Sequence, residues 1–404
     1  MRVLVLAPQP FFQERGTPID VLLVLRVLSE SMETDVDALV YHEGADVDLQ
    51  KVRLHRISVP RWIRGVRPGF SFKKLWCDLA MFRKAWRMVR TGNYDVIHAG
   101  EESVFMAVFF KRLFGVPYVY DLDSSVAQQL VERHPVLRLV SPLFDWLETL
   151  AIRGSLGTLP VCNALGDLCE RKGSRKNVIL HDISQLKDPQ RPKTGALNKE
   201  LGTNRLLVLY AGNLEAYQGI DLLLESFRRV CRECDSLDLV VIGGVPADIS
   251  RYRGLAEQWG LAGRAHFLGP RPFGQLDYYL AEADILACPR IRGINTPMKI
   301  FPYLHSGRPL IATDLPTHNQ LLTRQIAYLA PATPDGFAAG LIALASRPEL
   351  REQLGREGQA FIERNHTYEA HVRRLRSLYD WVEKQIGSGN GKAVGQPVSE
   401  AKSN

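Results

Sequence analysis

Short apolar runs rich in β-branched residues alternate with longer, helix-like stretches through the first 182 residues. The runs expected to form strands are Arg2–Ala7, Val36–Tyr41, Tyr94–His98, Tyr118–Asp121 and Gly157–Cys162. A helix is predicted over Ile19–Leu28, between the first two of them. Apolar strands separated by helices are typical of a parallel sheet that is covered on both faces. We therefore predict a Rossmann-like α/β domain over residues 1–182.

The same alternation starts again at residue 205, after a polar interruption. Residues 183–204 contain Pro189 and Pro192 and show no apolar periodicity, which predicts a linker. The strands expected beyond it are Arg205–Gly212, Leu237–Gly243, Ala265–Leu268, Asp284–Cys288 and Pro309–Thr313. The helices expected among them are Asp221–Cys231, Ile249–Trp259, Gln275–Ala281 and Pro297–Ser306. We predict a second Rossmann-like domain over 205–365, a helix over 366–386 that returns to the first domain, and a disordered tail over 387–404.

Two Rossmann-like domains in tandem are expected to face each other across a cleft, with ligands at the carboxyl ends of the strands. A content of 46% apolar and 24% charged residues fits a folded globular protein and excludes disordered and fibrous chains. No apolar run is long enough to predict a membrane-spanning helix. The six cysteines, among them Cys231 and Cys234, have the spacing of neither a disulfide framework nor a zinc site. We therefore expect a cytoplasmic protein without a metal.

The net charge of +7 is concentrated in one stretch of the chain. Residues 59–90 contain nine Arg and Lys side chains and one acid, Asp78, so this stretch carries +8 and the remainder −1. Because Trp, Ile and Phe are interleaved with these cations, we predict contact with an anionic membrane surface. The residues expected to make it are Trp62, Arg64, Arg67, Lys73, Lys74, Arg83, Lys84, Trp86, Arg87 and Arg90.

The same stretch also contains an apolar stripe at helical spacing, which is expected to pack in the core. Its residues are Leu75, Leu79, Phe82, Trp86 and Val89. Core packing does not explain the basic and aromatic residues beside the stripe. A solvated helix without a partner is the alternative to the membrane. Nucleic acid is not expected as a partner, since no helix-turn-helix, RNP or zinc-finger motif occurs.

Two turns that lead from a strand into a helix are candidates for binding an anion. Gly16 lets backbone approach a ligand closely, and Thr17 is placed to cap a helix whose free N–H groups attract negative charge. An ordinary capped turn explains the same two residues. In the second half, Gly212–Gly219 is a polar loop between two glycines that also contains Asn213 and Gln218. Its position before a helix predicts a phosphate cradle.

The segment after the strand Asp284–Cys288 is the most informative one. A loop with two guanidinium groups leads into a helix that Thr296 is expected to cap, with Pro297 in its first turn. This arrangement suits two adjacent phosphates, and a solvated basic loop is the alternative. The residues expected to bind there are Arg290, Arg292, Asn295, Thr296, Pro297, Met298 and Lys299.

Carboxylates follow a strand of the first half at its carboxyl end. His98 ends the strand Asp95–His98, and Glu101 and Glu102 come directly after it. An imidazole and two carboxylates at this edge are expected to face the cleft, where they are candidate catalytic groups. The alternative for either glutamate is stabilisation of the next helix at its N-terminus.

The tandem halves, the Gly212–Gly219 loop and the stretch Asn295-Thr-Pro-Met-Lys followed by Tyr-Leu-His-Ser-Gly-Arg-Pro309 resemble family 4 glycosyltransferases of GT-B architecture. The resemblance covers about residues 1–385. It implies transfer of a sugar from a nucleotide-diphosphate donor of the UDP or GDP type, without an essential metal or another cofactor, and usually with retention of anomeric configuration. It also implies a donor site on the second half and an acceptor site on the first.

The chain departs from that family at several positions. Carboxylates of the family would fall on Ile294 and Pro302, and the basic pair of its glycine loop on Asn213 and Gln218. The cations at 290, 292 and 299 are the expected substitutes. The family's sugar-site histidine would fall on Asp123, which could act as a base or cap the next helix.

The basic, aromatic stretch adds a lipid-linked or glycan acceptor at the inner face of the membrane to the expected activity. The alternatives are a nucleotide-sugar-binding scaffold without turnover and a sugar-nucleotide epimerase. We favour a divergent transferase, because cations near the lost positions compensate for them.

Overall fold

The computed structural model describes residues 1–12, 16–32, 34–45, 47, 49–66, 71–125 and 141–390, with side chains described to residue 388. Two compact units account for these residues. Unit 1 comprises Met1–Leu180 and the chain from Val372 onward, and unit 2 comprises His181–His371. Arg67 and residues 391–404 of the expected tail lie outside the described residues. Residues 387–390 belong to the helix Tyr368–Asn390, so the tail was predicted to start too early. No helix in the described ranges is both long and apolar enough to cross a bilayer.

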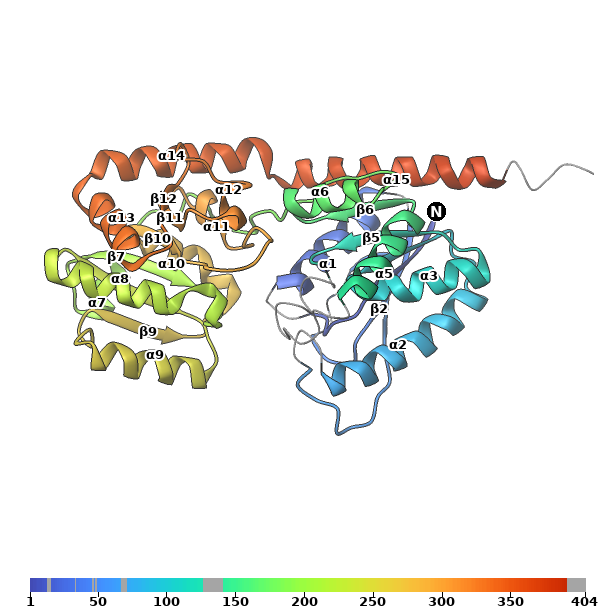
Figure 1. The fold of residues 1–404 in the computed structure, drawn as a ribbon, viewed down its shortest axis with the longest axis horizontal. Helices are drawn as coiled ribbons and strands as arrows, with labels where there is room; N and C mark the ends of the chain where they lie inside the picture. Colours follow the sequence, from blue (N-terminus) through green and yellow to red (C-terminus); the bar gives the residue numbers. More distant parts are fainter. Residues whose placement is uncertain are drawn as a thin grey trace, which may run out of the picture. The chain divides into compact units, whose positions relative to one another are not determined.

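Unit 1 contains a six-stranded parallel sheet in the order β3-β2-β1-β4-β5-β6. Its strands are β1 (Arg2–Ala7), β2 (Asp35–Val40), β3 (Val52–Arg56), β4 (Val96–Gly100), β5 (Tyr118–Leu122) and β6 (Gly157–Pro160). Figure 1 labels β2, β5 and β6 of this sheet. All but β3 lie within two residues of a predicted start. The sequence of β3 is Val-Arg-Leu-His-Arg, and it lies at the edge of the sheet. An edge strand is only partly buried, so it lacks the apolar run by which the others are recognised.

The helices of unit 1 pack around this sheet. They are α1 (Gly16–Arg26), which continues as the π-helical turn η1 (Val27–Ser31), α2 (Phe72–Thr91), α3 (Ser103–Phe114), α5 (Ser141–Gly154) and α6 (Asn163–Arg171). The helix α15 (Tyr368–Asn390) joins them from the far end of the chain. Tyr379 contacts His98 with its hydroxyl 2.9 Å from Nδ1, and Trp381 Nε1 donates to the carbonyl of Leu156 at 3.0 Å. The last helix therefore completes the core of unit 1.

Helix α2 buries a different face from the predicted one. Its buried residues are Cys77, Met81, Ala85 and Val89, spaced four apart. Leu75 and Leu79 of the predicted stripe are instead 53% and 52% exposed. The prediction of the core-facing stripe is therefore wrong at these two leucines, because the small Cys77 and Ala85 let the opposite face approach the sheet.

Unit 2 contains a second six-stranded parallel sheet, in the order β12-β11-β10-β7-β8-β9. Its strands are β7 (Leu206–Ala211), β8 (Leu237–Ile242), β9 (Ala265–Gly269), β10 (Ile285–Cys288), β11 (Leu310–Thr313) and β12 (Tyr328–Ala330). Read in the reverse direction, this order is β9-β8-β7-β10-β11-β12, so β7 to β12 take the positions that β1 to β6 have in unit 1. The two units therefore repeat one topology, which confirms the predicted pair of Rossmann-like domains.

The four helices predicted among the strands of unit 2 are all present, but the expected linker is wrong in part. The helices are α7 (Ala196–Leu201), α8 (Ile220–Glu233), α9 (Pro246–Gln258), α10 (Leu276–Glu282), α11 (Ile300–His305), α12 (Pro316–Asn319), α13 (Pro334–Ser346) and α14 (Pro348–Asn365). Helix α7 falls within the expected linker, and its Leu197 is fully buried. Glu282 accepts hydrogen bonds from the Thr194 amide and hydroxyl, each at 2.7 Å. This segment is therefore packed on unit 2.

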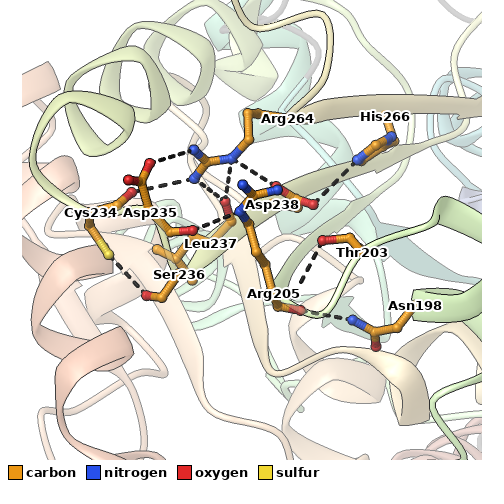
Figure 2. A network of polar contacts seen from close by, with 10 residues as sticks. All are labelled: Asn198, Thr203, Arg205, Cys234, Asp235, Ser236, Leu237, Asp238, Arg264 and His266. Carbon is orange, nitrogen blue, oxygen red and sulfur yellow. Dashed lines mark hydrogen bonds and ion pairs between the residues drawn. The ribbon is translucent and has the colours of Figure 1, made fainter.

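A buried carboxylate holds the amino ends of the strands together in unit 2 (Figure 2). Asp238 of β8 is fully buried, and Arg264 donates to its Oδ1 from Nε at 2.9 Å. His266 lies 3.6 Å from Oδ2, and Arg205 lies 3.7 Å from Oδ1. Arg264 also donates to the Leu237 carbonyl. Cations from both neighbouring strands thus compensate one buried negative charge.

Unit 1 has the same arrangement at the equivalent strands. Asp37 of β2 is 2% exposed and accepts hydrogen bonds from Arg53 at 2.8 and 3.0 Å and from Arg2 at 3.2 Å. His55 and Tyr94 contact the same carboxylate at 2.8 and 3.0 Å. Burial raises the pKa of Asp37, but these hydrogen bonds outweigh burial and hold it well below its ordinary value.

Candidate functional sites at the carboxyl ends of the two sheets

The carboxyl end of β7 in unit 2 leads into a loop that lies directly against Lys299. Gly212 has φ of +152°, and a Cβ atom there would lie 2.5 Å from Nζ of Lys299. Gly219 ends the loop, and a Cβ atom there would lie 1.9 Å from the carbonyl oxygen of Pro289. Glycine is therefore required at both ends, since it lets the loop approach the segment after β10. The two predicted binding segments of unit 2 are brought together.

Lys299 is held against an aromatic ring without a hydrogen-bond partner. Its Nζ lies 3.8 Å from the ring centroid of Tyr210, and no described residue accepts a hydrogen bond from it. Burial lowers the pKa of Lys299 to about 8. A buried cation whose donors are all unused is suited to bind an anion.

Two further polar side chains on the same segments are buried and unpaired. Gln218 is 7% exposed and Thr296 is 5% exposed, and neither Gln218 Oε1 nor Thr296 Oγ1 has a hydrogen-bond partner among the described residues. Leaving a buried polar group without a partner costs about 1–3 kcal/mol. Three such groups on the two segments that meet at Gly212 and Gly219 indicate a site for a polar ligand.

The helix that follows begins later than predicted. Helix α11 starts at Ile300 with Lys299 at its N-cap position, so Thr296 is not the cap and Pro297 is not in the first helical turn. The amides of Ile300 and Phe301 donate instead to the carbonyls of Pro297 and Met298, at 3.0 and 3.2 Å. This turn supplies the partners that a capping side chain would have supplied, which leaves the Thr296 hydroxyl unpaired.

Arg290 supports its own loop. Its Nε donates to the carbonyl of Arg292 at 2.8 Å and its Nη1 to that of Asn295 at 3.2 Å. Its guanidinium also lies 5.1 Å from the ring centroid of Tyr217. Arg292 is exposed. The two arginines predicted to bind phosphate therefore have different surroundings. Arg290 is hydrogen-bonded within its own loop, and Arg292 faces solvent.

Polar side chains that follow β11 fix the same loop from the other side. Thr313 donates to the Arg290 carbonyl at 2.5 Å, Thr317 to the Asn295 carbonyl at 2.6 Å, and Gln320 to the Ile294 carbonyl at 2.7 Å. These residues were not predicted. Their position at the carboxyl end of β11 was the signal that could have found them, because loops at this edge of a parallel sheet meet.

Two tyrosines that the sequence did not single out fix the glycine loop. The Tyr210 hydroxyl donates to the Asn213 carbonyl at 2.5 Å. The Tyr303 hydroxyl accepts from the Ala211 amide at 2.7 Å and donates to the Ala211 carbonyl at 3.2 Å. The side chain of Asn213 is exposed, and its Nδ2 lies 3.4 Å from the Tyr217 hydroxyl.

In unit 1, the predicted catalytic residue His98 lies inside the fold. It is 2% exposed. Its Nε2 lies 3.0 Å from Asp121 Oδ2, and its Nδ1 lies 2.9 Å from the Tyr379 hydroxyl. Both ring nitrogens are thus engaged. The structure places His98 as a link between β4, β5 and α15, which does not fit contact with a substrate.

Glu101 directly follows β4 in an unusual backbone conformation. Its φ is +47°, and its amide donates to the Asp121 carbonyl at 3.1 Å. Burial and the charge of the neighbouring Glu102 raise the pKa of Glu101 to about 7. Glu102 is ion-paired with Lys74, whose side chain is 13% exposed. A carboxyl group that titrates near neutral pH is suited to accept a proton from a substrate.

The other predicted residues of unit 1 near this edge are only partly buried. Asp123 is half-buried directly after β5, and residues 126–140, where it was expected to cap a helix, lie outside the described residues. Gly16 is exposed with φ of +42° and begins α1. Thr17 lies inside that helix, so the prediction that it caps α1 is wrong.

The surface of α2 and the loop before it carries exposed aromatic and basic side chains. Trp62, Phe72 and Trp76 are 59%, 68% and 40% exposed, and the rings of Trp62 and Phe72 each lie 6.4 Å from that of Trp76, edge to face. The predicted cations exposed on this surface are Arg64, Lys73, Arg83, Arg87 and Arg90. We call these eight residues the α2 surface.

Three of the residues predicted for this surface are engaged elsewhere. Lys74 is directed toward Glu102, and Lys84 Nζ donates to the Arg56 carbonyl at 2.7 Å. Trp86 is half-buried, with its ring 5.6 Å from that of Phe109. Hydrogen bonding and aromatic packing account for these three without a partner.

Both units match family models of glycosyltransferases. Residues 205–347 match the model described as "Glycosyl transferases group 1", and residues 19–180 match the "Glycosyl transferase 4-like domain". The chain is 23% identical to an alpha-D-kanosaminyltransferase of Streptomyces kanamyceticus, over 69% of this chain and 74% of that protein. It is 26% identical to a phosphatidyl-myo-inositol mannosyltransferase of Mycobacterium leprae, over 77% of this chain and 80% of that protein.

Solved structures share the fold. A sucrose-phosphate synthase from Thermosynechococcus elongatus superposes with a TM-score of 0.78 at 16% identity, over 96% of this chain and 99% of that one. Anabaena HepE in complex with UDP-glucose superposes with a TM-score of 0.73 at 14% identity, over 94% of this chain and 99% of that one. The GT-B fold class is therefore confirmed.

Proposed function

Since the chain belongs to the glycosyltransferases that these two family models describe, we propose that it transfers a sugar from a nucleotide-diphosphate donor to a lipid-linked or glycan acceptor at a membrane surface. The observation that carries the donor part is the group of unpaired polar atoms on Gln218, Thr296 and Lys299. The proposal includes retention of the anomeric configuration, which the family resemblance favours.

In this proposal, unit 2 binds the diphosphate of the donor. When the glycosidic bond breaks, negative charge develops on the departing diphosphate. Lys299 is a fixed cation next to the Gly212 backbone, and Thr296 supplies a hydroxyl donor on the same segment. Groups that are already oriented toward developing charge lower the barrier without reorganising. This arrangement supports the expectation that the reaction proceeds without a metal.

Unit 1 binds the acceptor in this proposal. The acceptor hydroxyl must lose a proton as it forms the new bond, and Glu101 is suited to take it because its pKa lies near 7. Asp123 lies after the next strand of the same sheet and is the second candidate for contact with an acceptor hydroxyl. Glu102 and Lys74 act behind Glu101 by setting the charge around it.

The α2 surface supports the membrane part of the proposal. Aromatic side chains are favourable at the interface between lipid and water, and a basic residue near an anionic surface contributes about 1 kcal/mol of attraction. The relative from M. leprae is named for a phospholipid, phosphatidyl-myo-inositol. We therefore propose that unit 1 binds the cytoplasmic face of an anionic membrane and takes its acceptor from there.

The decisive test combines nucleotide binding with turnover. UDP and GDP binding would be measured by calorimetry, and transfer from UDP- and GDP-sugars to a membrane extract by product mass. We expect Lys299→Ala to lower turnover about a hundredfold, because it removes one oriented contact to the leaving group. A matched control is Lys187→Ala, which changes a lysine of unit 2 outside the proposed site.

Each alternative gives a distinct result in this assay. Binding of a nucleotide without transfer or donor hydrolysis would favour a scaffold, consistent with Ile294 and Pro302 at positions where the family has carboxylates. A changed sugar nucleotide formed without any acceptor would favour an epimerase. Unchanged turnover in Lys299→Ala would remove Lys299 from the mechanism.

A further inference from the structure

Among the described residues, the titratable groups near the ammonium group of Lys299 do not carry a negative charge. Burial raises the pKa of the Cys288 thiol at the end of β10, so the thiol stays protonated at neutral pH. Burial lowers the pKa of His318 of α12 to about 4, so this ring stays neutral. Arg290, on the loop after β10, is itself a cation. Burial also raises the pKa of Tyr303 of α11, so its hydroxyl stays neutral.

The ring of Tyr210 also faces the Lys299 ammonium group, and it is fixed in place. Tyr210 is fully buried in β7, and its hydroxyl is hydrogen-bonded to the Asn213 carbonyl at 2.5 Å. The next residue, Ala211, is held by Tyr303 through both its amide and its carbonyl. The face of an aromatic ring attracts a cation, but this attraction is much weaker than an ion pair with a carboxylate. The ring therefore holds Lys299 without neutralising it.

We infer that binding of the donor diphosphate is coupled to the uptake of one proton by Lys299, and that Tyr210 is the positioning residue that makes this coupling possible. The inference rests on the proposed donor site. Without a ligand, the amine exchanges between its protonated and neutral forms, and the share of the neutral form grows as the pH rises. When the diphosphate arrives, the amine takes a proton from the buffer, and the resulting ammonium donates to phosphate oxygens.

The coupling has a defined pH dependence. A free lysine that titrates near pH 8 is mostly protonated at pH 7 and mostly neutral at pH 8.5. The bound diphosphate raises its pKa again, toward or above the ordinary range. Uptake is therefore expected to be about 0.1 proton per nucleotide at pH 7 and about 0.7 at pH 8.5. Affinity is expected to fall about tenfold per pH unit once the pH exceeds 8.

The test is calorimetry of UDP and GDP binding to the full-length protein in Tris and in Bicine, two buffers that differ in ionisation enthalpy. The difference in binding heat between the buffers gives the number of protons taken up. Lys299→Arg is the matched control, because its guanidinium stays charged at every pH used. This variant is expected to bind nucleotide while almost no proton is taken up by the side chain at position 299. Any protons contributed by the nucleotide itself remain in this control.

Two variants of Tyr210 test the positioning role. Tyr210→Phe keeps the ring and is expected to keep the proton uptake of the wild type. Tyr210→Leu removes the ring but keeps the apolar surroundings, so the pKa of Lys299 should fall further. We expect more uptake at pH 7.5 and about tenfold weaker binding at pH 7. If Tyr210→Leu does not fold, the comparison of the wild type with Lys299→Arg still decides whether the coupling exists.

The outcomes separate this inference from the proposed function. Nucleotide binding with equal heats in both buffers at pH 8.5 overturns the coupling but leaves the donor site intact. Equal proton uptake by the wild type and Lys299→Arg would likewise overturn the coupling and leave the donor site intact. Equal uptake and affinity in Tyr210→Leu and the wild type overturn the role of the ring. Absence of nucleotide binding to the wild type contradicts the proposed function itself.

Discussion

The two sheets of the molecule resemble each other at their amino ends and differ at their carboxyl ends. At the amino ends, Asp37 and Asp238 occupy equivalent second strands, and each is surrounded by cations from the neighbouring strands. The same Arg-x-His pattern occurs at the third strand of both units, as Arg53 with His55 within β3 and as Arg264, directly before β9, with His266. The amino ends therefore repeat one structural solution.

At the carboxyl ends, the segments that follow the equivalent strands β4 and β10 carry opposite charge. Unit 1 has acidic groups there, with Glu101 and Glu102 after β4 and Asp121 in β5. Unit 2 has cations, with Arg290 and Lys299 on the segment between β10 and α11. The charged groups at the amino ends hold strands together, whereas those at the carboxyl ends lie mainly on loops and differ between the two units. The comparison teaches that one topology can carry different chemistry on the loops that follow its strands.

The largest expected effect comes from breaking the repeated amino ends. We expect Asp37→Asn and Asp238→Asn each to lower the free energy of unfolding by about 3–5 kcal/mol, because cations are left without their buried partner. Urea denaturation followed by circular dichroism measures the change. In the wild type, the contribution of Asp37 is present above pH 4, since its ordinary pKa is 3.8, and is lost as the pH falls further.

The control for this experiment uses the same arginine. Asp235 also contacts Arg264, at 3.1 Å, but its side chain is 91% exposed. Asp235→Asn is therefore expected to cost less than about 1 kcal/mol. Equal losses for the variants at 235 and 238 would contradict the role of the buried carboxylate.

The next largest effect is expected at the carboxyl end of unit 1. Glu101→Gln should lower turnover about a hundredfold, since it removes the proposed proton acceptor. Activity of the wild type should rise as the pH increases through about 7, where Glu101 loses its proton, and the variant should lack this rise. The measurement is a pH profile of kcat/KM for sugar transfer.

The stability of the same variant distinguishes a functional from a structural role. Because the folded protein raises the pKa of Glu101, ionisation of this group destabilises the fold as the pH rises from 4.5 to about 7. Glu101→Gln should therefore be as stable as the wild type at pH 4 and more stable at pH 8. The exposed Glu233→Gln of unit 2 is the control and should change neither activity nor stability. A destabilised Glu101→Gln would assign the residue to the fold.

A smaller effect is expected where unit 2 fixes its basic loop. Thr317→Val removes the hydrogen bond to the Asn295 carbonyl but keeps the shape of the side chain. We expect KM for the donor to rise roughly threefold to tenfold, because one hydrogen bond contributes about 1 kcal/mol. Steady-state kinetics check this, with Ser346→Ala on the surface of α13 as control. A fall in kcat with an unchanged KM would contradict a role in loop position.

The smallest effect is expected on the α2 surface. Arg87→Gln removes one exposed cation, so binding to vesicles that contain anionic lipid should weaken about fivefold. Co-sedimentation with vesicles measures this. Arg356→Gln is the control, since Arg356 is 72% exposed in unit 2. Equal effects of the two variants, or binding that does not respond to anionic lipid, would remove the membrane from the proposal.

Burial decided how much of the fold could be predicted from the sequence. Strands such as β1 and β8 are buried on both faces, so their apolar runs mark them clearly. The edge strand β3 carries Arg53 and His55, so it has no apolar run and was not predicted as a strand. On α2, side-chain volume determined which face is buried, and periodicity alone does not report volume.

The candidate donor site was predictable only in its loops. Gly212 and Lys299 lie on segments that follow strands, and the predicted topology brought these segments to one edge. Tyr210 lies inside an apolar strand, where nothing in the sequence distinguishes a ring that faces a cation from one that fills the core. Thr296 was assigned as a cap because its residue type favours caps, but a turn of backbone hydrogen bonds replaced that role.

The helix α15 has a consequence for the order in which the polypeptide becomes a folded protein. Leu375, Leu378, Tyr379 and Val382 are fully buried, and they belong to a segment that the ribosome makes after all of unit 2. The amino-terminal half of the chain therefore cannot complete its own interior until this helix has been made. A fragment that stops near residue 180 exposes the apolar surface that this helix covers. Because unit 1 contains residues from both sides of unit 2, no single cleavage of the polypeptide separates the two units with each one complete.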